Sequence, residues 1–368
     1  MKASAPTDQL QKKLSFINHG VSARADLPVL LNILIEAKDG KITLSSTNLE
    51  IGIQTSIPAT VEEEGGITVP AKTFTELISS LPQETISLTT EDATLRVKSK
   101  KTQSSFQTIA KEEFPKLYEE KGELLAKLPI KTLQEDFSSV IFSASIDTGR
   151  PALSGILMRR EEQGFLLVAT DGYRLSLKHA TLTHIPGEEV SLLVPARIFR
   201  DVLSLKEGKE AVEVYVSPEK NQVLFQQGET VLIGRLIGAE FPNYERIIPS
   251  EHSAVTAFDR EELLKAVKIC SIFARDAANI ITLSLKKDAI IVSSQTPSLG
   301  ENTVTVEASL TGEENEIAFN ARYLLDVLSN VDRETLTFEM TGPLNPGVFR
   351  IKDDTSFLHL IMPIRIQA

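Results

Sequence analysis

The sequence predicts an α+β protein made of three tandem copies of one unit, each with helices packed on one face of an antiparallel sheet. Three observations lead to this prediction. A helical segment recurs at constant spacing, a second helical pattern opens each copy, and the stretches between them alternate apolar and polar residues as strands do. The length of 368 residues also exceeds what one ordinary hydrophobic core supports.

The recurring segment begins at Val69, Val194 and Phe319. Its alanines Ala71, Ala196 and Ala321 are 125 residues apart each time (196 − 71 and 321 − 196). The same register aligns further positions of matching type, which are Lys72, Arg197 and Arg322, then Glu76, Asp201 and Asp326, then Ser79, Ser204 and Ser329. Chance similarity rarely preserves both spacing and residue type, so the segments indicate internal duplication.

Each recurring segment carries a signal for the start of a helix. Pro70 and Pro195 suit the first helical position, and Asn320 suits the N-cap. Apolar residues then follow at helical spacing, and these are Phe74, Leu77, Ile78 and Leu81 in the first copy, Phe199, Val202 and Leu203 in the second, and Leu324, Val327 and Leu328 in the third. The pattern predicts one amphipathic helix per copy.

A second amphipathic helix is predicted at the opening of each copy. Its apolar stripes are Leu10-Leu14-Ile17, Leu133-Phe137-Val140 and Leu263-Val267-Cys270. Cys270 is thereby given a core position rather than a reactive one. Period-two alternation at 41–44, 86–88, 212–216 and 336–340 predicts strands, and turn formers such as Asp39-Gly40 separate them.

Two stretches without periodicity collect charges and turn formers and therefore predict linkers. They lie around residues 119–122 and 249–252. The predicted domains are residues 1–124, 125–250 and 251–368. A sheet that ends in an unpaired edge invites association, so successive copies should pair their edges, and two such chains joined by equivalent contacts could close into a ring.

Composition limits the function classes. Hydrophobic residues at 42% and charged residues at 24% are typical of a soluble globular protein, and no stretch has the apolar length of a membrane span. The single cysteine fits a reducing cytoplasm. The histidines, which are His19, His179, His184, His252 and His359, have no metal-ligand spacing, so no metal or cofactor is expected.

An enzyme is one alternative. Asp171 with Thr170 and Arg174 is the best catalytic-looking cluster, but it lacks a second carboxylate or a histidine at a suitable spacing, and the chain has no phosphate-binding, nucleophile-elbow or dinucleotide motif. The sequence therefore favours a non-catalytic protein. A tandem-repeat scaffold that binds peptides without encircling DNA is the second alternative, and composition leaves it open.

Several motifs beside the threefold repeat resemble one family. They are Arg24-Ala-Asp-Leu-Pro28, Ala169-Thr-Asp-Gly-Tyr-Arg-Leu175, Glu240-Phe-Pro-Asn-Tyr244 and Leu360-Ile-Met-Pro-Ile-Arg365. In this order they resemble the bacterial DNA polymerase III beta subunit, the replicative sliding clamp, over the whole chain. The resemblance implies a homodimeric ring of six domains, with helices inside and sheets outside, that encircles duplex DNA without sequence specificity and confers processivity on the replicative polymerase.

The resemblance also implies a hydrophobic pocket between the second and third copies that binds short peptides. The implied partners are the clamp loader, the DNA polymerase III alpha subunit, other polymerases and repair proteins. The pocket residues carried over by motif are Leu153, Thr170, Gly172, Tyr173, Arg174, Leu175, Pro242, Arg246, Ile247, Leu344, Leu360, Met362, Pro363, Ile364 and Arg365. Apolar walls with a few placed polar groups suit peptides with aromatic and leucine anchors.

DNA contacts are expected from basic residues on the inner rim. The candidates are Arg24, Arg150, Lys12, Lys13, Lys72, Arg197, Arg200, Lys265, Lys268 and Arg322. The net charge of −11 argues against ordinary nucleic-acid affinity, but a ring can keep its acidic surface outside and a mildly basic hole inside. For dimer closure the expected contact joins Phe106 of the first copy to Ile272 and Phe273 of the third.

Overall fold

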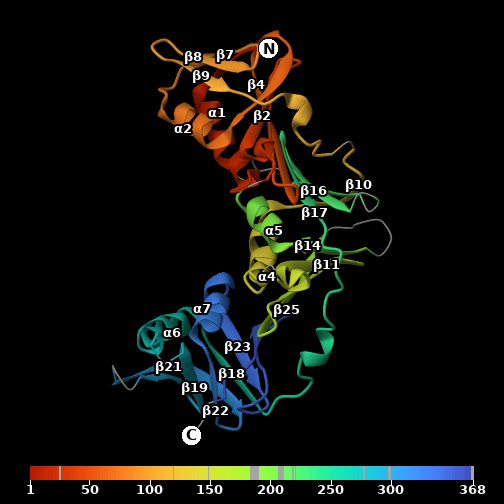
Figure 1. Cartoon of the computed structure of the whole chain (residues 1–368). Coiled ribbons are helices and arrows are strands. Elements are labelled where there is room, and N and C mark those ends of the chain that lie inside the picture. The colour runs from red at the N-terminus through yellow and green to blue at the C-terminus, as the bar shows by residue number, and fades with distance from the viewer. Residues whose placement is uncertain are drawn as a thin grey trace. The chain divides into compact units, whose positions relative to one another are not determined.

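The computed structural model describes residues 1–24, 26–118, 120–147, 149–182, 190–205, 211–217, 219, 221–276, 278–296 and 300–365. Ala25 of the first motif, Glu119 of the first linker and His184 lie outside the described residues. The chain forms two compact units (Figure 1). Unit 1 comprises Met1–Ile130 and Arg200–Leu236, and unit 2 comprises Lys131–Phe199 and Ile237–Ala368. The middle copy of the repeat thus contributes to both units.

In the described part of unit 1, two complete helices and two sheets are present. The helices are α1 (Thr7–Ile17) and α2 (Ala71–Ser80). The strands are β1 (Lys2–Pro6), β2 (Asn32–Lys38), β3 (Lys41–Thr47), β4 (Ile51–Pro58), β5 (Thr60–Glu63), β6 (Gly65–Pro70), β7 (Thr85–Glu91), β8 (Thr94–Lys98), β9 (Gln103–Gln107), β10 (Glu123–Leu128), β15 (Val212–Ser217), β16 (Gln222–Gln227) and β17 (Thr230–Arg235). The sheet orders are β5-β1-β7-β8-β9 and β10-β15-β16-β17-β4-β3-β2-β6.

Unit 2 is built on one twelve-stranded sheet, with the order β14-β11-β12-β13-β25-β24-β23-β18-β21-β20-β19-β22. Its strands are β11 (Gly155–Glu161), β12 (Gly164–Thr170), β13 (Arg174–Thr181), β14 (Ser191–Pro195), β18 (Ala254–Asp259), β19 (Ile280–Lys286), β20 (Ala289–Thr296), β21 (Gly300–Gly312), β22 (Asn315–Asn320), β23 (Thr335–Met340), β24 (Gly347–Ile351) and β25 (Asp354–Ile361). Its helices are α4 (Ser138–Ile141), α6 (Arg260–Ala274) and α7 (Ala321–Asn330).

Two further helices span the boundary between the units, α3 (Ile130–Thr132) and α5 (Ala196–Leu203). Short 3-10 turns occur at Asn18–Gly20, Pro28–Leu31, Lys111–Glu113, Pro151–Ser154 and Glu245–Ile247. Among the described residues, every helix is too short or too polar to cross a bilayer.

The predicted duplication is confirmed in the local structure. Ala71, Ala196 and Ala321 are the first residues of α2, α5 and α7, and each alanine is buried. A strand ends immediately before each helix. Asn320 caps α7 as expected, because its Oδ1 accepts a hydrogen bond from the Arg322 amide at 2.9 Å. The helix α2 begins one residue later than predicted. Pro70 is its N-cap and not its first helical residue, because Pro70 still belongs to strand β6.

The opening helices also agree with the prediction, with one difference in the middle copy. The apolar stripes of α1 and α6 are buried, including Cys270, whose burial raises the pKa of its thiol to about 11. In the middle copy, Leu133–Phe137 forms a π-helical turn between α3 and α4. Hydroxyls of Ser138 and Ser139 donate to the preceding carbonyls of Gln134 and Asp136, and this competition with backbone amides favours an irregular helix.

Successive copies share sheets by pairing strands edge to edge, as the sequence predicts. In unit 1, β17 of the middle copy pairs with β4 of the first, with Leu232 opposite Ile53. In unit 2, β13 of the middle copy pairs with β25 of the third, with Leu175 opposite Leu360. Each join satisfies backbone groups that would otherwise form an exposed edge. The joins also bring sequence-distant turns together.

A tight backbone approach in unit 2 offers a test of the sheet geometry. Gly164 opens β12 with φ of +139°, and a Cβ there would overlap the carbonyl oxygen of Ala180 on β13. We expect Gly164→Ala to lower the free energy of unfolding by about 1–3 kcal/mol, because backbone must shift to accept the methyl group. Gly238→Ala is the matched control, since nothing lies within 4 Å of its added Cβ. Equal denaturation midpoints for the two variants would contradict the described β12–β13 approach.

Candidate functional site

The turn between β12 and β13 is held by its own polar side chains. The Thr170 hydroxyl donates to the Arg174 carbonyl at 2.6 Å and accepts from the Gly172 amide at 3.0 Å. Asp171 Oδ1 accepts from the amides of Tyr173 at 2.9 Å and Arg174 at 3.0 Å. Gly172 has φ of +92°, a conformation that glycine adopts without strain. The turn is therefore rigid, and it presents Tyr173 with 60% of its surface exposed.

Arg174 fixes this turn to the third copy of the repeat. Its side chain is only 7% exposed, and its guanidinium binds Asp171 Oδ2 at 3.0 Å and Asp326 Oδ2 on α7 at 2.5 Å. It also donates to the Phe142 carbonyl at 2.7 Å and lies 4.7 Å above the Tyr323 ring. A buried guanidinium with this many partners has a structural role, so its predicted place in the pocket wall is a supporting one.

The C-terminal segment lies beside the same turn. The Met362 amide donates to the Tyr173 carbonyl at 2.8 Å, and the Ile364 amide donates to the Ala318 carbonyl at 2.8 Å. Met362 has 38% of its surface exposed next to Tyr173. The first of these hydrogen bonds extends the β13–β25 pairing by one position, so an exposed aromatic ring and a flexible thioether become neighbours. The second joins the C-terminal segment to β22.

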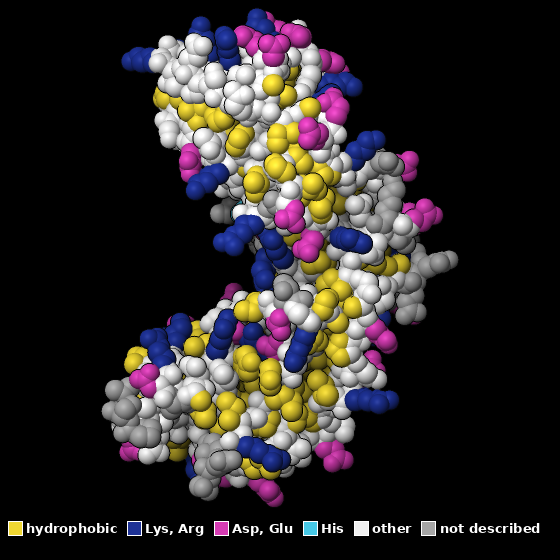
Figure 2. Space-filling model, in the orientation of Figure 1, with side chains coloured by type: hydrophobic (Ala, Val, Ile, Leu, Met, Phe, Trp, Pro, Cys, Tyr) yellow, Lys and Arg dark blue, Asp and Glu magenta, His cyan; other side chains and the backbone are white. Residues whose placement is uncertain are grey.

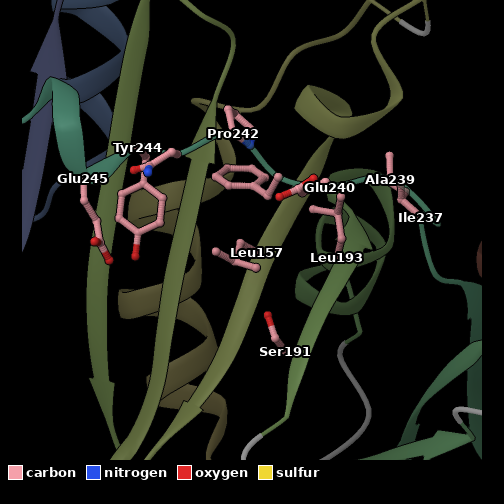
Figure 3. A pocket seen from close by; sticks show the side chains of 11 residues that line it. Leu157, Ser191, Leu193, Ile237, Ala239, Glu240, Pro242, Tyr244 and Glu245 are labelled. Atoms are coloured by element: carbon pink, nitrogen blue, oxygen red, sulfur yellow. The ribbon is translucent and has the colours of Figure 1, made fainter.

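The segment that carries Pro242 covers the sheet nearby. Tyr244 is buried in an apolar cluster with Leu175 and Leu360, and this burial raises the pKa of its phenol. A cavity of about 480 Å³ lies along this segment (Figure 3), with Leu157 of β11 and Leu193 of β14 on the sheet below Pro242. Pro242 is the one predicted pocket residue among the described residues that line this cavity, and Tyr173 and Met362 are not part of its lining.

The predicted pocket residues differ in exposure. The exposed residues are Gly172, Tyr173, Pro242, Arg246, Ile247, Leu344, Met362 and Arg365, the half-buried ones are Leu153, Pro363 and Ile364, and the buried ones are Thr170, Arg174, Leu175 and Leu360. Tyr173, Ile247, Leu344 and Met362 are among the large hydrophobic side chains exposed in the chain. Apolar side chains gather on the visible face of unit 2 around β23 and β25 (Figure 2). Such exposure is typical of a binding surface.

The structure brings some of the predicted pocket residues together, and other residues line the cavity beside them. A Cβ on Gly172 would lie 3.9 Å from both Leu153 and Arg150. Gly172 and Leu153, two predicted pocket residues, are therefore neighbours, and Arg150, which was predicted to contact DNA, lies beside them. Within the described residues, no side-chain hydrogen bond or ion pair ties Arg246 or Arg365 to this turn. Leu157, Leu193, Phe241 and Tyr244 line the cavity beside Pro242 and were not among the predicted pocket residues. The Glu240–Tyr244 motif was the signal for the last two.

A buried histidine lies beneath the β13–β25 join. His359 Nδ1 is 2.7 Å from the Ser176 hydroxyl, which is 2.7 Å from the Ser143 hydroxyl. Nε2 of His359 has no hydrogen-bond partner among the described residues, and the ring packs against Phe142 and Phe349. Burial, with a smaller contribution from the nearby Arg174 charge, holds the pKa of His359 well below 6.5. The histidine is neutral in the folded protein.

The predicted DNA-binding side chains are mostly exposed. Exposed positions are Arg24, Lys12, Lys72, Arg150, Arg197, Arg200, Lys265, Lys268 and Arg322. Lys13 is half-buried and lies 3.4 Å from the Thr230 hydroxyl. Lys and Arg side chains are interspersed with Asp and Glu over much of the visible surface, with a group of basic side chains near α5 (Figure 2). Two acidic residues in helical segments are engaged in ion pairs. Asp326 on α7 binds Arg174, and Asp136 in the π-helical turn binds Lys178.

The predicted dimer contacts lie at an edge strand and a helix end. Phe106 is on β9, an edge of the five-stranded sheet, but most of its ring is buried against Phe74 at 5.7 Å. Near the end of α6, Ile272 is exposed and Phe273 half-buried. In the described part of the chain, no cluster of His, Cys, Asp and Glu has the arrangement of a metal site.

Family models match the chain in three consecutive parts. The models are the N-terminal domain of the DNA polymerase III beta subunit at residues 1–118, its central domain at 127–243 and its C-terminal domain at 245–365. A beta sliding clamp of Synechococcus elongatus is 30% identical, and the match covers 100% of both chains.

Two solved structures are similar over the full length of both chains. A DNA polymerase sliding clamp from Bacillus subtilis has a TM-score of 0.95 at 26% identity. A sliding clamp, DNA polymerase III subunit beta, from Pseudomonas aeruginosa bound to griselimycin has a TM-score of 0.91 at 25% identity.

Arg174 gives a stability prediction. Arg174→Ala should lower the free energy of unfolding by about 3 kcal/mol, because it leaves Asp171 and Asp326 without their cation. Arg150→Ala, which removes an exposed guanidinium from the same neighbourhood, should change it by less than about 0.5 kcal/mol. Chemical denaturation measures both. If both variants lost the same small amount of unfolding free energy, the Arg174 network would contribute little to stability.

His359 gives a pH prediction. Its folded pKa is depressed, so below pH 6.5 the unfolded chain binds a proton that the folded chain does not. This group therefore lowers the free energy of unfolding as pH falls from 6.5 towards the folded pKa, by up to about 1.4 kcal/mol per unit. His359→Gln should show a shallower loss when denaturation is measured between pH 7 and 5. An unchanged slope would show that His359 makes no contribution.

Proposed function

The chain belongs to the DNA polymerase III beta subunit family, and from this premise we propose that it is a sliding clamp, a processivity factor of DNA replication. The observation that carries the proposal is the full-length match, in which all three copies of the repeat find their counterparts in order. Two chains form a homodimeric ring of six domains, with domain boundaries near residues 124 and 250.

The ring encircles duplex DNA and contacts its phosphates through the exposed lysines and arginines named above. Support comes from their helices, because Lys72, Arg197 and Arg322 occupy the same register of the repeat in α2, α5 and α7 and are all exposed. A net charge of −11 keeps the overall attraction weak. Weak, sequence-independent contacts permit sliding, while the closed ring prevents dissociation.

Partner proteins dock on unit 2 by a short peptide. The peptide lies across Tyr173, Pro242 and Met362, and its apolar anchors enter the cavity above Leu157 and Leu193. The partners are the clamp loader, the DNA polymerase III alpha subunit, other polymerases and repair proteins. The same tether serves each of them because an adaptable apolar surface accepts different anchors.

The remaining parts of the proposal concern closure, chemistry and location. Phe106 and the exposed Ile272 with Phe273 close the dimer between partner chains, where β9 offers a free strand edge. The protein is not an enzyme, since the carboxylate of Asp171 is occupied by two amides and Arg174. Its place of action is the cytoplasm.

Encirclement of DNA is tested by comparing retention of the protein on circular and on linear DNA. The protein is loaded on nicked circular plasmid by a compatible clamp loader with ATP, and the plasmid is then cut once with a restriction enzyme. We expect retention on the circle during gel filtration and release after cutting, because a topological link ends where the DNA ends. Retention on the linear DNA would instead indicate direct affinity and favour a conventional DNA-binding protein.

The peptide pocket is tested by a charge placed at its rim. Met362→Asp should weaken binding of a fluorescent peptide with leucine and phenylalanine anchors about a hundredfold, because docking would desolvate the new carboxylate. Met362→Leu is the control and should bind within about threefold of the original. Fluorescence anisotropy measures the peptide affinity. Analytical ultracentrifugation measures whether the protein is still a dimer. If Met362→Asp dissociated the dimer and left peptide affinity intact, Met362 would belong to the interface.

A further inference from the structure

Unit 1 contains a second copy of the turn that builds the candidate peptide pocket. The turn between β3 and β4 runs from Thr47 to Ile51. Its Thr47 hydroxyl donates to the Ile51 carbonyl at 2.9 Å and accepts from the Leu49 amide at 3.0 Å. Asn48 Oδ1 accepts from the amides of Glu50 at 3.0 Å and Ile51 at 2.8 Å. Each of these bonds has its equivalent at residues 170–174.

The surroundings of the two turns are duplicated as well. The Arg235 amide donates to the Glu50 carbonyl at 2.9 Å, as the Met362 amide donates to the Tyr173 carbonyl in unit 2. Strand β17 pairs with β4 just as β25 pairs with β13. Glu113-Phe-Pro115 repeats Glu240-Phe-Pro242, so a chain segment with the same sequence signal passes each turn. Unit 1 therefore rebuilds the backbone frame of the pocket.

A groove of about 290 Å³ lies at this frame in unit 1. Ile51 and Ile233 form its buried apolar floor, and Leu49 and Leu117 stand at its sides. Leu49 holds φ of +73°, a left-handed conformation that is unfavourable for leucine, and it leaves 54% of its surface exposed. An apolar side chain held in this strained, exposed state is available for a ligand.

The charges at the groove differ from those at the unit 2 pocket. Arg235 stands where unit 2 has Met362, and Lys116 stands where it has Asn243. Both cations are exposed, and neither makes an ion pair within the described residues. Among the described residues of the lining, Glu50 is the one carboxylate, so the two cations leave this part of the groove with a positive balance. An acidic ligand is complementary to this arrangement.

We propose that the unit 1 groove is a second docking site, for a short peptide of a partner protein in which one aliphatic anchor is followed by acidic residues. The anchor packs between Leu49 and Leu117, and the carboxylates pair with Lys116 and Arg235. At about 290 Å³, the groove takes one anchor. The inference goes beyond the proposed function, since the two sites share no residue.

The test uses the full-length protein and the fluorescein-labelled peptide Gly-Ser-Leu-Asp-Glu, with affinity measured by fluorescence anisotropy at low salt. The double variant Lys116→Glu with Arg235→Glu should bind at least tenfold more weakly. A second peptide, Gly-Ser-Leu-Lys-Lys, should regain that affinity on the double variant, a charge-swap rescue that a misfolded protein could not give. Leu49→Asn, which tolerates the left-handed backbone, should also weaken binding at least fivefold.

Met362→Asp separates this inference from the unit 2 pocket. It should leave Gly-Ser-Leu-Asp-Glu binding within twofold while it abolishes binding of the leucine and phenylalanine peptide. The second site is overturned if the acidic peptide does not saturate, if the double variant binds it unchanged, or if Met362→Asp removes its binding. A failure of the proposed unit 2 pocket would appear only in binding of the leucine and phenylalanine peptide. A failure of the unit 1 site would appear only in binding of the acidic peptide, so the two can be distinguished.

Discussion

Main-chain hydrogen bonds between strands of successive copies hold each unit together, because an α+β repeat of this size ends in strand edges whose amides and carbonyls need partners. Pairing of β4 with β17 and of β13 with β25 provides those partners. Both joins also place a turn of one copy beside the end of a strand from another. The candidate pocket in unit 2 and the groove in unit 1 arise at these places, so binding surfaces follow from the way in which the edges are satisfied.

The two joins have diverged in chemistry while their backbones remain alike. In unit 2, Arg174 reaches across to Asp326 and leaves Gly172 and Tyr173 to form an open apolar surface. In unit 1, Ile51 occupies the equivalent position and is buried in the floor, while Leu49 carries the left-handed turn. The network of Arg174 makes the second join rigid through ionic contacts, whereas the first relies on apolar packing. Duplication followed by such divergence permits different ligands on one frame.

Electrostatics explain how an acidic protein can act on DNA. The lysines and arginines on α2, α5 and α7 are exposed, whereas Asp326 is engaged with Arg174 and Asp201 is buried. The helices therefore present more exposed positive charge than their composition suggests. The interspersed carboxylates still limit attraction to the phosphates, which is compatible with movement along DNA and incompatible with tight static binding.

From the sequence alone, the repeat at 125-residue spacing, the apolar stripes of α1, α2, α6 and α7 and the period-two strands were predictable, because helical and strand periodicities depend on local spacing. The family motifs also pointed to Tyr173 and Met362. Only the tertiary structure decided that the middle copy divides between two units, that Arg174 is buried between two carboxylates, and that Leu157 and Leu193 underlie Pro242. These features depend on which strand edges pair and on side chains that meet from distant positions, and no local pattern encodes such long-range contacts.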